Sequence, residues 1–232
     1  MAHEALSREA FAAELRSLAP RYWDGHPFHV RLHAGECGPG EVRSWVANRW
    51  YYQQILARKN AAVIANCPLP AVRRQWLSRV VFHDRATEDW LVLGDAVGLS
   101  RESLLDERYV ARGTRFAVDG YLQFCREKPW TEAAAAALTE MFSPTLMAAR
   151  VVAWREHYDW IKPDGYTYFE NRIPVVRDDA RYTLDLVLTH CRTKDMQIAA
   201  VKALAFKCDV LGAMLDAIDY QAGAGRGGTA RP

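Results

Sequence analysis

Residues 41–65 read EVRSWVANRWYYQQILARKNAAVIA, a run that contains neither glycine nor proline. Apolar side chains recur through it at the three- and four-residue spacing of one helical face, at Trp45, Tyr52, Leu56 and Val63. Residues that form turns or stop helices flank the run, with Gly38-Pro39-Gly40 before it and Pro68 after it. The run therefore predicts a long helix with one face in a protein core.

Helical spacing continues through most of the chain, and no segment shows the sustained two-residue alternation of a half-buried strand. Ser7 is placed to cap a first helix, and Pro144 should kink the alanine-rich helix expected at 131–158. Further helices are expected at about 8–18, 71 to beyond 83, 88–97, 100–105, 114–126, 177–192 and 194–220. We therefore expect an all-α protein folded as a compact helical bundle.

Length and composition predict one soluble domain, the catalytic domain, over residues 1–221. Hydrophobic residues make up 50% and charged residues 25% of the 232 residues, which is enough apolar surface for a core. The net charge of +2 and the lack of a dense Lys/Arg run argue against nucleic acid and anionic membranes as partners. Charged residues interrupt the most apolar stretch, 198–218, so we expect a buried helix there and no membrane span.

Cysteine usage and the N-terminus favour a cytoplasmic location. The five cysteines are odd in number and form no C-x-x-C pair, which argues against a disulfide framework or a zinc ribbon. Residues 1–14 lack the basic and then continuously apolar pattern of a secretory signal. We expect residues 222–232, with their four glycines, to form a flexible tail or a linker to a further domain.

Polar residues fall on helix faces that the apolar period assigns to the interior. Arg49 and Lys59 lie on the stripe of the 41–65 helix, and Gln53 lies beside it. A buried charge without a partner costs several kcal/mol, so each of these groups needs one. Side chains that snorkel to the surface or pair with internal carboxylates would also explain the pattern.

Two later helices repeat this pattern. Arg79 and His83 share an apolar face, and Lys207 lies among apolar residues of the last helix, where it could pair with Asp209 or Glu140. Several inward cations with few matching acids predict a closed cavity for a small polyanion, above all a polycarboxylate. Each charge-assisted contact there is worth roughly 1.5 to 3 kcal/mol. Residue chemistry thus indicates a ligand class and leaves the reaction open.

Motifs for other chemistries are absent from the sequence. There is no Walker loop, no H-E-x-x-H and no G-x-S-x-G, and the glycine pattern at 223–228 follows no strand. His26, His29 and His33 have the one metal-like spacing, but Pro27 interrupts it and no Glu-x-x-His accompanies it. We favour packing and hydrogen bonding for these histidines over metal binding.

Several segments form an ordered pattern along the chain. They are HPFH at 26–29, WVANR at 45–49 with YYQ at 51–53, ANCP at 65–68, GDAVGL at 94–99, RFAVD at 115–119 with Tyr121, TEMFSP at 139–144, YTYF at 166–169 and FKCD at 206–209. Over about residues 7–220 this pattern resembles the pyrroloquinoline quinone (PQQ) synthases.

The resemblance implies a heme-oxygenase-like, TenA-like helical bundle that is usually a homodimer. Enzymes of this family close the last ring of a tricarboxylate quinone precursor (AHQQ) and oxidise it by eight electrons with dioxygen, releasing hydrogen peroxide. It implies an oxidoreductase that needs no metal or organic cofactor, since PQQ is the product and dioxygen a co-substrate. In some relatives a small carrier protein of the PQQ pathway follows the synthase, which keeps such a partner open for this chain.

The resemblance also assigns residues to roles. Arg49, Gln53, Lys59, Arg79 and Lys207 match substrate anchors, and His83 matches a general base or acid. It adds Tyr121, Glu140, Arg150, Tyr168 and Arg172 to the site. We expect His83, Tyr168 and Arg172 to carry the chemistry, with Tyr168 and Arg172 one helical turn apart. A core role for Tyr168, and pairing of Arg172 with Glu170 or Asp178, remain the alternatives.

Three departures from the family pattern bear on activity. Met147 stands where many members have a histidine, and Trp23 stands where relatives have a histidine after the tyrosine matching Tyr22. The segment after Asp84 is shorter than usual. A metal-dependent oxygenase on the same bundle, with His26, His29 or His83 as ligands, is the alternative enzyme. A PQQ-binding carrier without activity is the alternative outside catalysis.

Overall fold

The computed structural model describes residues 4–226, and all regular secondary structure in that range is helical. This confirms the all-α prediction. The α-helices are α1 (Arg8–Arg16), α2 (Pro27–His33), α3 (Pro39–Asn66), α4 (Pro70–Ala96), α5 (Arg101–Leu105), α6 (Arg112–Glu127), α7 (Trp130–Ala136), α8 (Ser143–His157), α9 (Thr167–His190) and α10 (Lys194–Arg226). Short 3-10 helices lie at η1 (Ala19–Arg21), η2 (Trp23–Gly25), η3 (Ala137–Phe142) and η4 (Pro163–Tyr166).

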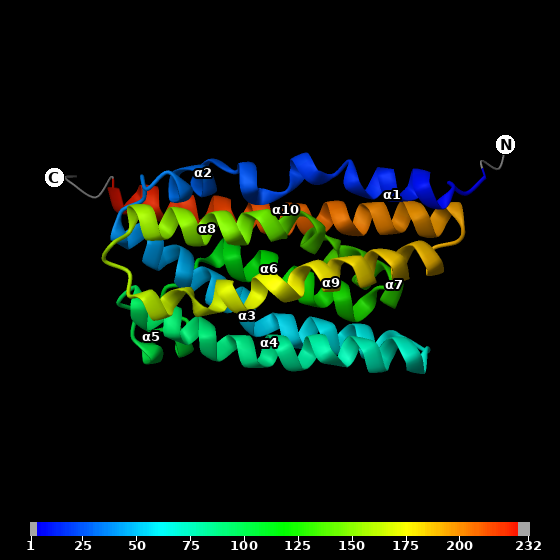
Figure 1. Cartoon of the computed structure of the whole chain (residues 1–232), viewed down its shortest axis with the longest axis horizontal. Helices are drawn as coiled ribbons and strands as arrows, with labels where there is room; N and C mark the ends of the chain where they lie inside the picture. Colours follow the sequence, from blue (N-terminus) through cyan, green and yellow to red (C-terminus); the bar gives the residue numbers. More distant parts are fainter. Residues whose placement is uncertain (1–3, 227–232) are drawn as a thin grey trace.

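The 41–65 run forms most of α3, as predicted. Pro39 lies in the first turn, and the Glu41 carboxylate accepts a 3.0 Å hydrogen bond from the Gly38 N–H. The short connection to α4 makes the two long helices antiparallel neighbours, and together they form one side of the bundle (Figure 1). The pair α8 and α9 lies across from them, and α10 packs against α3, α6 and α7. The site lies among these elements.

Three expected helix boundaries were wrong. The two helices expected around His83 are one helix, α4, because residues 84–87 contain no glycine or proline to break it. The helix expected from 177 begins at Thr167 and contains Pro174 within it. The single kinked helix expected at 131–158 is divided into α7, η3 and α8. Pro144 lies in the first turn of α8, where a missing N–H leaves no helical hydrogen bond unmade.

The last helix also extends further than expected. α10 continues to Arg226, so residues 222–226 of the predicted flexible tail are helical. The rest of the predicted tail, 227–232, lies outside the described residues, and its role as a linker stays a prediction.

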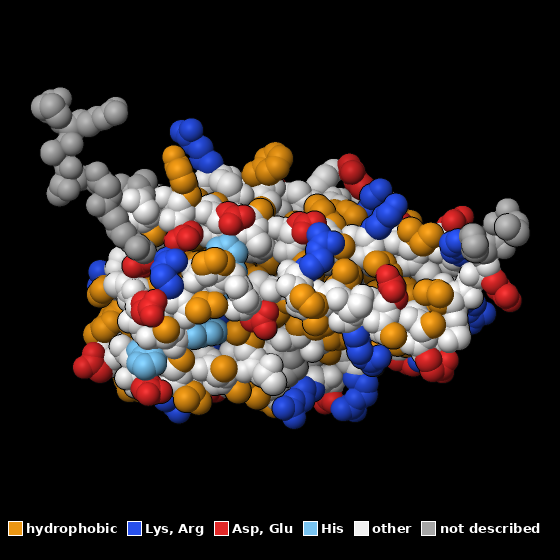
Figure 2. All heavy atoms as spheres, turned by 90° about the horizontal axis from the view of Figure 1, so that it is seen from above, with side chains coloured by type: hydrophobic (Ala, Val, Ile, Leu, Met, Phe, Trp, Pro, Cys, Tyr) orange, Lys and Arg blue, Asp and Glu red, His pale blue; other side chains and the backbone are white. Residues whose placement is uncertain are grey.

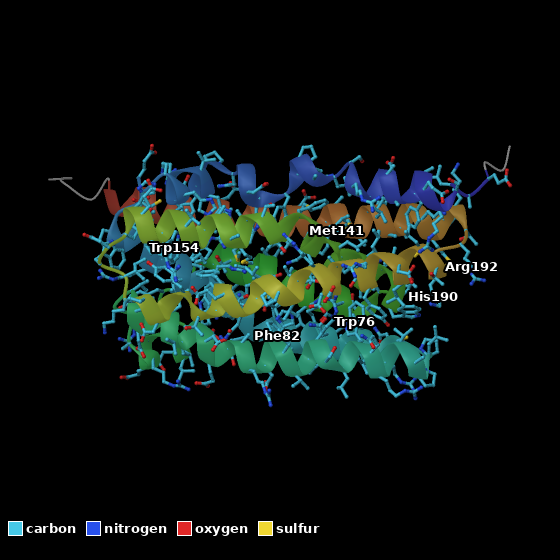
Figure 3. The ribbon with its side chains drawn as sticks, in the orientation of Figure 1. Trp76, Phe82, Met141, Trp154, His190 and Arg192 are labelled. Carbon is cyan, nitrogen blue, oxygen red and sulfur yellow. The ribbon has the colours of Figure 1, made fainter. Side chains whose placement is uncertain are left out.

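Aromatic side chains fill the core beside the site. The Trp45 ring centre lies 5.6 Å from that of Trp90 and 5.5 Å from that of Trp154, and Phe169 completes the cluster. Figure 3 shows Trp154 on α8, and Trp76 and Phe82 on the part of α4 that faces α9. These tilted, edge-to-face and stacked ring pairs fix ring positions and hold the helices that carry the site.

All five cysteine side chains are buried. Burial raises the pKa of the Cys125 thiol, and it raises the pKa of Cys191 and of Cys208 to about 11. On the face shown in Figure 2, acidic and basic side chains are interspersed, in keeping with the small net charge. None of the described helices combines the length and the apolar character needed to cross a bilayer.

Candidate active site

A cavity of about 60 Å³ lies in the middle of the bundle, between α3, α4, α9 and α10. Its lining residues are Tyr22, Trp23, Arg49, Tyr52, Leu56, Lys59, His83, Tyr121, Ala137, Thr139, Glu140, Ser143, Met147, Tyr168, Arg172, Lys207 and Leu211. This volume holds a few water molecules, whereas ligand pockets usually measure about 300 to 1,000 Å³. A tricyclic ligand therefore requires lining side chains to move.

The cavity brings together most of the site residues expected from the sequence. Those that line it are Arg49, Lys59, His83, Tyr121, Glu140, Tyr168, Arg172 and Lys207. Gln53, Arg79 and Arg150 are buried and do not line it. The inward placement that the helical period assigned to the polar residues of α3, α4 and α10 is thereby confirmed.

His83 lies on α4 in the cavity wall. Within the described chain, neither of its ring nitrogens has a hydrogen-bond partner. Burial, and then the charges of Arg172 and Lys59, lower the pKa of the imidazole well below its usual value. The ring is therefore neutral near pH 7, and one of its nitrogens can accept a proton.

Arg49 is surrounded by aromatic rings. Its guanidinium carbon lies 4.8 Å from the ring centre of Trp23, 4.5 Å from that of Tyr52 and 5.6 Å from that of Trp90. Aromatic faces attract a cation but offer it no acceptor oxygen. Accordingly, Nε and Nη1 of Arg49 make no hydrogen bond to any residue in the range 4–226. These N–H groups can bind a ligand carboxylate.

Lys207 lies between two tyrosine rings, with its Nζ 4.1 Å from the ring centre of Tyr52 and 3.9 Å from that of Tyr121. The pairing suggested with Asp209 or Glu140 was wrong, because both carboxylates bind arginines. Asp209 follows two residues later on α10 and is exposed, whereas Lys207 faces the core. Burial, and then nearby cations, lower the pKa of the Lys207 ammonium well below its usual value.

Four charged side chains form a closed ring of ion pairs at the cavity edge, which we call the four-charge ring. Glu140 accepts from Arg79 at 2.8 Å and from Arg172 at 2.9 Å. Asp179 lies 3.0 Å from Arg172 Nη1 and 3.6 Å from Arg79 Nε. Two arginines and two carboxylates sum to zero charge. The ring therefore holds Arg172 in place without adding net charge to the cavity.

The four-charge ring replaces the suggested partners of Arg172. Glu170 pairs with Arg155 and Asp178 with Arg181, so neither binds Arg172. Burial alone would raise the pKa of the Glu140 carboxyl. The charges of the surrounding arginines and of Lys59 outweigh this effect and lower the pKa below its ordinary value.

Tyr168 and Arg172 lie one turn apart on α9, and both face the cavity, as expected from the sequence. The Gln53 Nε2 donates a 2.8 Å hydrogen bond to the Tyr168 hydroxyl. The Tyr168 ring packs edge-on against Trp90, with 4.7 Å between ring centres. The phenol is thus held from two sides, and Gln53 contacts it from behind the cavity wall.

Arg150 is fully buried outside the cavity lining. Its guanidinium carbon lies 4.8 Å from the Trp45 ring centre, and its Nη2 lies 3.4 Å from His29 Nε2. Burial, and then the charge of Arg49, lower the pKa of Arg150 to about 9. Arg150 therefore adds positive potential behind Arg49, and its role as a direct anchor stays a prediction.

Two of the three histidines with metal-like spacing bind different partners, and the His33 ring stacks on His29 with 5.9 Å between ring centres. His26 pairs with Asp216 at 3.1 Å. His29 bonds the Trp23 carbonyl oxygen at 3.0 Å through Nδ1 and accepts from the Trp45 indole N–H at 3.2 Å. In the described part of the chain, no three or more His, Cys, Asp or Glu side chains group as metal ligands. Whether the protein works without metal remains a prediction.

The cavity has an excess of positive charge. Arg49, Lys59 and Lys207 line it and form no ion pair with any acidic side chain of the described residues. The four-charge ring is neutral, so these three cations are left without compensation. Burial lowers the pKa of Lys59 to about 8, so this ammonium is still mostly charged at pH 7. Bound anions would offset the charge.

Several lining residues were not assigned to the site from the sequence, namely Tyr22, Tyr52, Leu56, Ala137, Thr139, Ser143 and Leu211. Aromatic and apolar residues at helical spacing look like ordinary core, and no sequence signal separates the two cases. Trp23 and Met147 were noted as departures from the family pattern, and both line the cavity. Comparison with relatives is the signal that finds such positions.

Comparison with known sequences agrees with this site. The model of the TENA/THI-4/PQQC family matches residues 12–217. A protein of Cronobacter sakazakii named pyrroloquinoline-quinone synthase is 46% identical over 92% of this chain and 87% of its own length. A protein of Pseudomonas aeruginosa with the same name is 43% identical over 94% of this chain and 90% of its own length.

Solved structures agree on the fold. A domain with a heme oxygenase-like fold from Shewanella denitrificans superposes with a TM-score of 0.81 at 12% identity, covering 97% of each chain. A TenA homologue from Pseudomonas syringae superposes with a TM-score of 0.74 at 12% identity, covering 91% of this chain and 92% of its own. The predicted heme-oxygenase-like, TenA-like bundle is therefore confirmed.

Proposed function

This chain belongs to the TENA/THI-4/PQQC family, and we propose on that basis that it is the oxidoreductase that completes PQQ. The reaction is ring closure and eight-electron oxidation of the tricarboxylate quinone precursor AHQQ. Dioxygen is the acceptor, and hydrogen peroxide is released. The relatives at 43 to 46% identity are named for PQQ synthesis, which supports this assignment.

One observation carries the assignment to a tricarboxylate. Three cavity cations, Arg49, Lys59 and Lys207, have no carboxylate partner in the described structure, and the adjoining four-charge ring is neutral. Three carboxylates on one ligand match three such cations. Each charge-assisted contact in a desolvated site contributes roughly 1.5 to 3 kcal/mol. A neutral or cationic ligand would leave these charges unpaired.

The reaction needs a base, an acid and a site for reduced oxygen. Each two-electron oxidation of the ring system releases two electrons and two protons, and neutral His83 can accept one of these protons. Dioxygen takes up two electrons and two protons to form hydrogen peroxide. The Arg172 guanidinium and the Tyr168 hydroxyl both line the cavity and can donate hydrogen bonds to the reduced-oxygen anion. The substrate's own quinoid system carries the electrons, so the proposal includes no metal or organic cofactor.

We place the enzyme in the cytoplasm as a homodimer. A carrier protein or domain of the PQQ pathway is the partner that we propose on the C-terminal side. These statements rest on the family resemblance and on the cysteine pattern.

The decisive experiment mixes purified, metal-analysed protein with AHQQ in aerobic and in anaerobic buffer. The quinone spectrum and peroxide are followed together. We expect PQQ and peroxide in air at sub-stoichiometric metal, and binding without oxidation under nitrogen. Binding in air with neither product would support the carrier alternative. Activity that tracks stoichiometric iron and is lost with a chelator would support the metal-dependent oxygenase.

A further inference from the structure

One part of the cavity wall, which we call the donor corner, consists of Tyr22, Trp23, Arg49 and Arg150. The first three line the cavity, and Arg150 is buried behind them. Burial raises the pKa of the Tyr22 phenol to about 12, while the nearby Trp23, Arg49 and Arg150 side chains each oppose this rise. The four side chains are therefore close neighbours, and the donor corner contains no carboxylate.

Five nitrogen atoms of the donor corner have no acceptor for their hydrogens. They are Nε1 of Trp23 and the Nε and Nη1 atoms of Arg49 and Arg150, and none has a hydrogen-bond partner among residues 4–226. Trp23, Arg49 and Arg150 are only 4%, 3% and 0% exposed. A buried donor without an acceptor destabilises the protein, and a charged donor does so more strongly. The donor corner therefore requires a bound molecule with acceptor atoms.

Positive charge is concentrated at the same place. After burial, the charge of Arg49 is the strongest influence on Arg150, whose pKa is lowered to about 9, and on Lys207, whose pKa is also lowered. In the part of the chain that the structure describes, no acidic side chain forms an ion pair with any of these three cations. Water could accept the hydrogens but would leave the charge uncompensated. An anion supplies both the acceptor and the opposite charge.

The size of the cavity limits which anion can bind in this state of the protein. Its volume of about 60 Å³ holds a few water molecules. A halide ion or a small planar oxyanion such as nitrate has a comparable size, whereas a tricyclic tricarboxylate does not fit. The planar guanidinium edge binds a small oxyanion through two parallel N–H groups.

We propose that the free protein binds one small monovalent anion in the donor corner, of the chemical class of chloride and nitrate. The N–H groups of Arg49 and Trp23 bond it directly, and Arg150 adds positive charge from behind. A carboxylate of the substrate needs the same donors, so the anion leaves when the tricarboxylate enters. This last step rests on the proposed function, and it makes substrate affinity depend on the kind of anion present as well as on ionic strength.

The test is the thermal stability of the ligand-free, full-length protein at constant ionic strength, with gluconate, which is too large for the cavity, exchanged for chloride. We expect Tm to rise with chloride concentration, because a ligand that binds only the folded state stabilises it. Nitrate should act in the same way. Arg49→Met and Arg150→Met should each weaken the chloride affinity obtained from these curves about tenfold or more.

A matched control changes an arginine on the surface. Arg74 is exposed and forms no ion pair with the other described residues, so Arg74→Met should keep the chloride dependence of the wild type. Trp23→Phe is a milder variant, because it keeps an aromatic ring beside Arg49 and removes the indole N–H. It should weaken chloride binding about 2- to 10-fold.

Crystals of the free protein soaked in bromide locate the anion by its anomalous scattering. We expect a peak within hydrogen-bonding distance of Arg49. Bromide at the outer surface alone, an equal Tm in chloride and gluconate, or an undiminished chloride dependence in both Arg49→Met and Arg150→Met would overturn the proposal. These readouts involve neither AHQQ nor PQQ, so they are independent of the reaction proposed above.

Competition tests the exchange of the anion for the ligand. At constant ionic strength, the Kd of PQQ should rise about threefold or more when about 150 mM chloride replaces gluconate. Arg74→Met should show the same rise. A Kd that does not change would overturn the shared use of these donors by the anion and the tricarboxylate.

Discussion

Gln53 donates a 2.8 Å hydrogen bond to the hydroxyl of Tyr168, although only Tyr168 lines the cavity. The amide therefore acts on the site through the phenol. Gln53 was expected to be a direct anchor, and its position behind the cavity wall gives it a positioning role.

Removal of this hydrogen bond should affect turnover only when Tyr168 is present. We expect Gln53→Leu to lower kcat with little change in KM, because Tyr168 loses a fixed orientation. In a double-mutant cycle with Tyr168→Phe, the two losses should be coupled by about 1 kcal/mol. Additive effects would show that Gln53 acts elsewhere, for example on the substrate itself.

Substitutions of His83 and of Arg49 should affect different steps, the first mainly the oxidation and the second mainly ligand binding. His83→Ala should keep PQQ binding close to wild type and lower kcat about 100-fold or more, because it removes a positioned base. Arg49→Ala should weaken PQQ binding by about 10- to 150-fold, because it removes a charge-assisted contact. Titration calorimetry and single-turnover kinetics measure the two effects. Equal turnover in wild type and His83→Ala would refute the assignment of the base.

Lys207 should make the free protein less stable. Burial lowers its pKa well below the ordinary value of 10.5. Between these two pKa values the unfolded chain binds more protons, so the unfolding free energy of the wild type rises with pH. Lys207→Met should therefore raise Tm near pH 7 by an amount equivalent to about 1 kcal/mol or more, with a smaller gain at pH 9.5. Calorimetry at both pH values tests this, and a lower Tm for the variant would contradict it.

Loss of a carboxylate from the four-charge ring should destabilise the fold more than loss of a neighbouring surface carboxylate. Asp179→Asn removes the negative charge between Arg79 and Arg172 and replaces one acceptor oxygen by an N–H donor, so we expect a loss of about 1 to 3 kcal/mol in unfolding free energy. Asp178→Asn is the matched control, because its partner Arg181 is exposed and lies 3.5 Å away. That change should stay within about 0.5 kcal/mol. Urea denaturation compares the two variants, and equal losses would argue against the ring.

The lowered pKa of Lys59 predicts that ligand affinity decreases at high pH. Because its pKa is lowered to about 8, the ammonium loses its charge as pH rises above that value. Affinity for a tricarboxylate should then fall progressively between about pH 8 and 9.5. Lys59→Arg keeps the positive charge at all these pH values, so the affinity of this variant should depend less on pH. A wild-type affinity that stays constant to pH 9.5 would exclude Lys59 as an anchor.

The helical period was sufficient to place the polar residues but not to pair them. It assigned Arg49, Lys59, Arg79 and His83 to interior faces, and the structure buries all four. Pairing depends on residues from other helices, and Asp179 lies 100 positions after Arg79 with no sequence mark of its role. A single sequence carries the period of each helix but not the rotation of one helix against another.

Some site residues could be placed from the helical period, whereas others could not. Tyr121, Glu140 and Tyr168 were found through the family resemblance, because a tyrosine or glutamate in a helix has no chemical signature by itself. The uninterrupted α4 was missed, because two helices were expected there, at 71 to beyond 83 and at 88–97. The segment there has no breaking residue, and helical hydrogen bonding continues through it.

The burial of all five cysteines has a consequence for an enzyme that we propose releases hydrogen peroxide. Peroxide oxidises the thiolate and not the thiol, and the raised pKa values of Cys125, Cys191 and Cys208 keep these sulfurs protonated at neutral pH. Cys125 is the cysteine nearest to the reaction among these three, because the charges of the cavity residues Lys59 and Lys207 act on it. These charges lower its pKa, but burial raises the pKa by more. We therefore expect these thiols to react slowly with peroxide formed in the cavity.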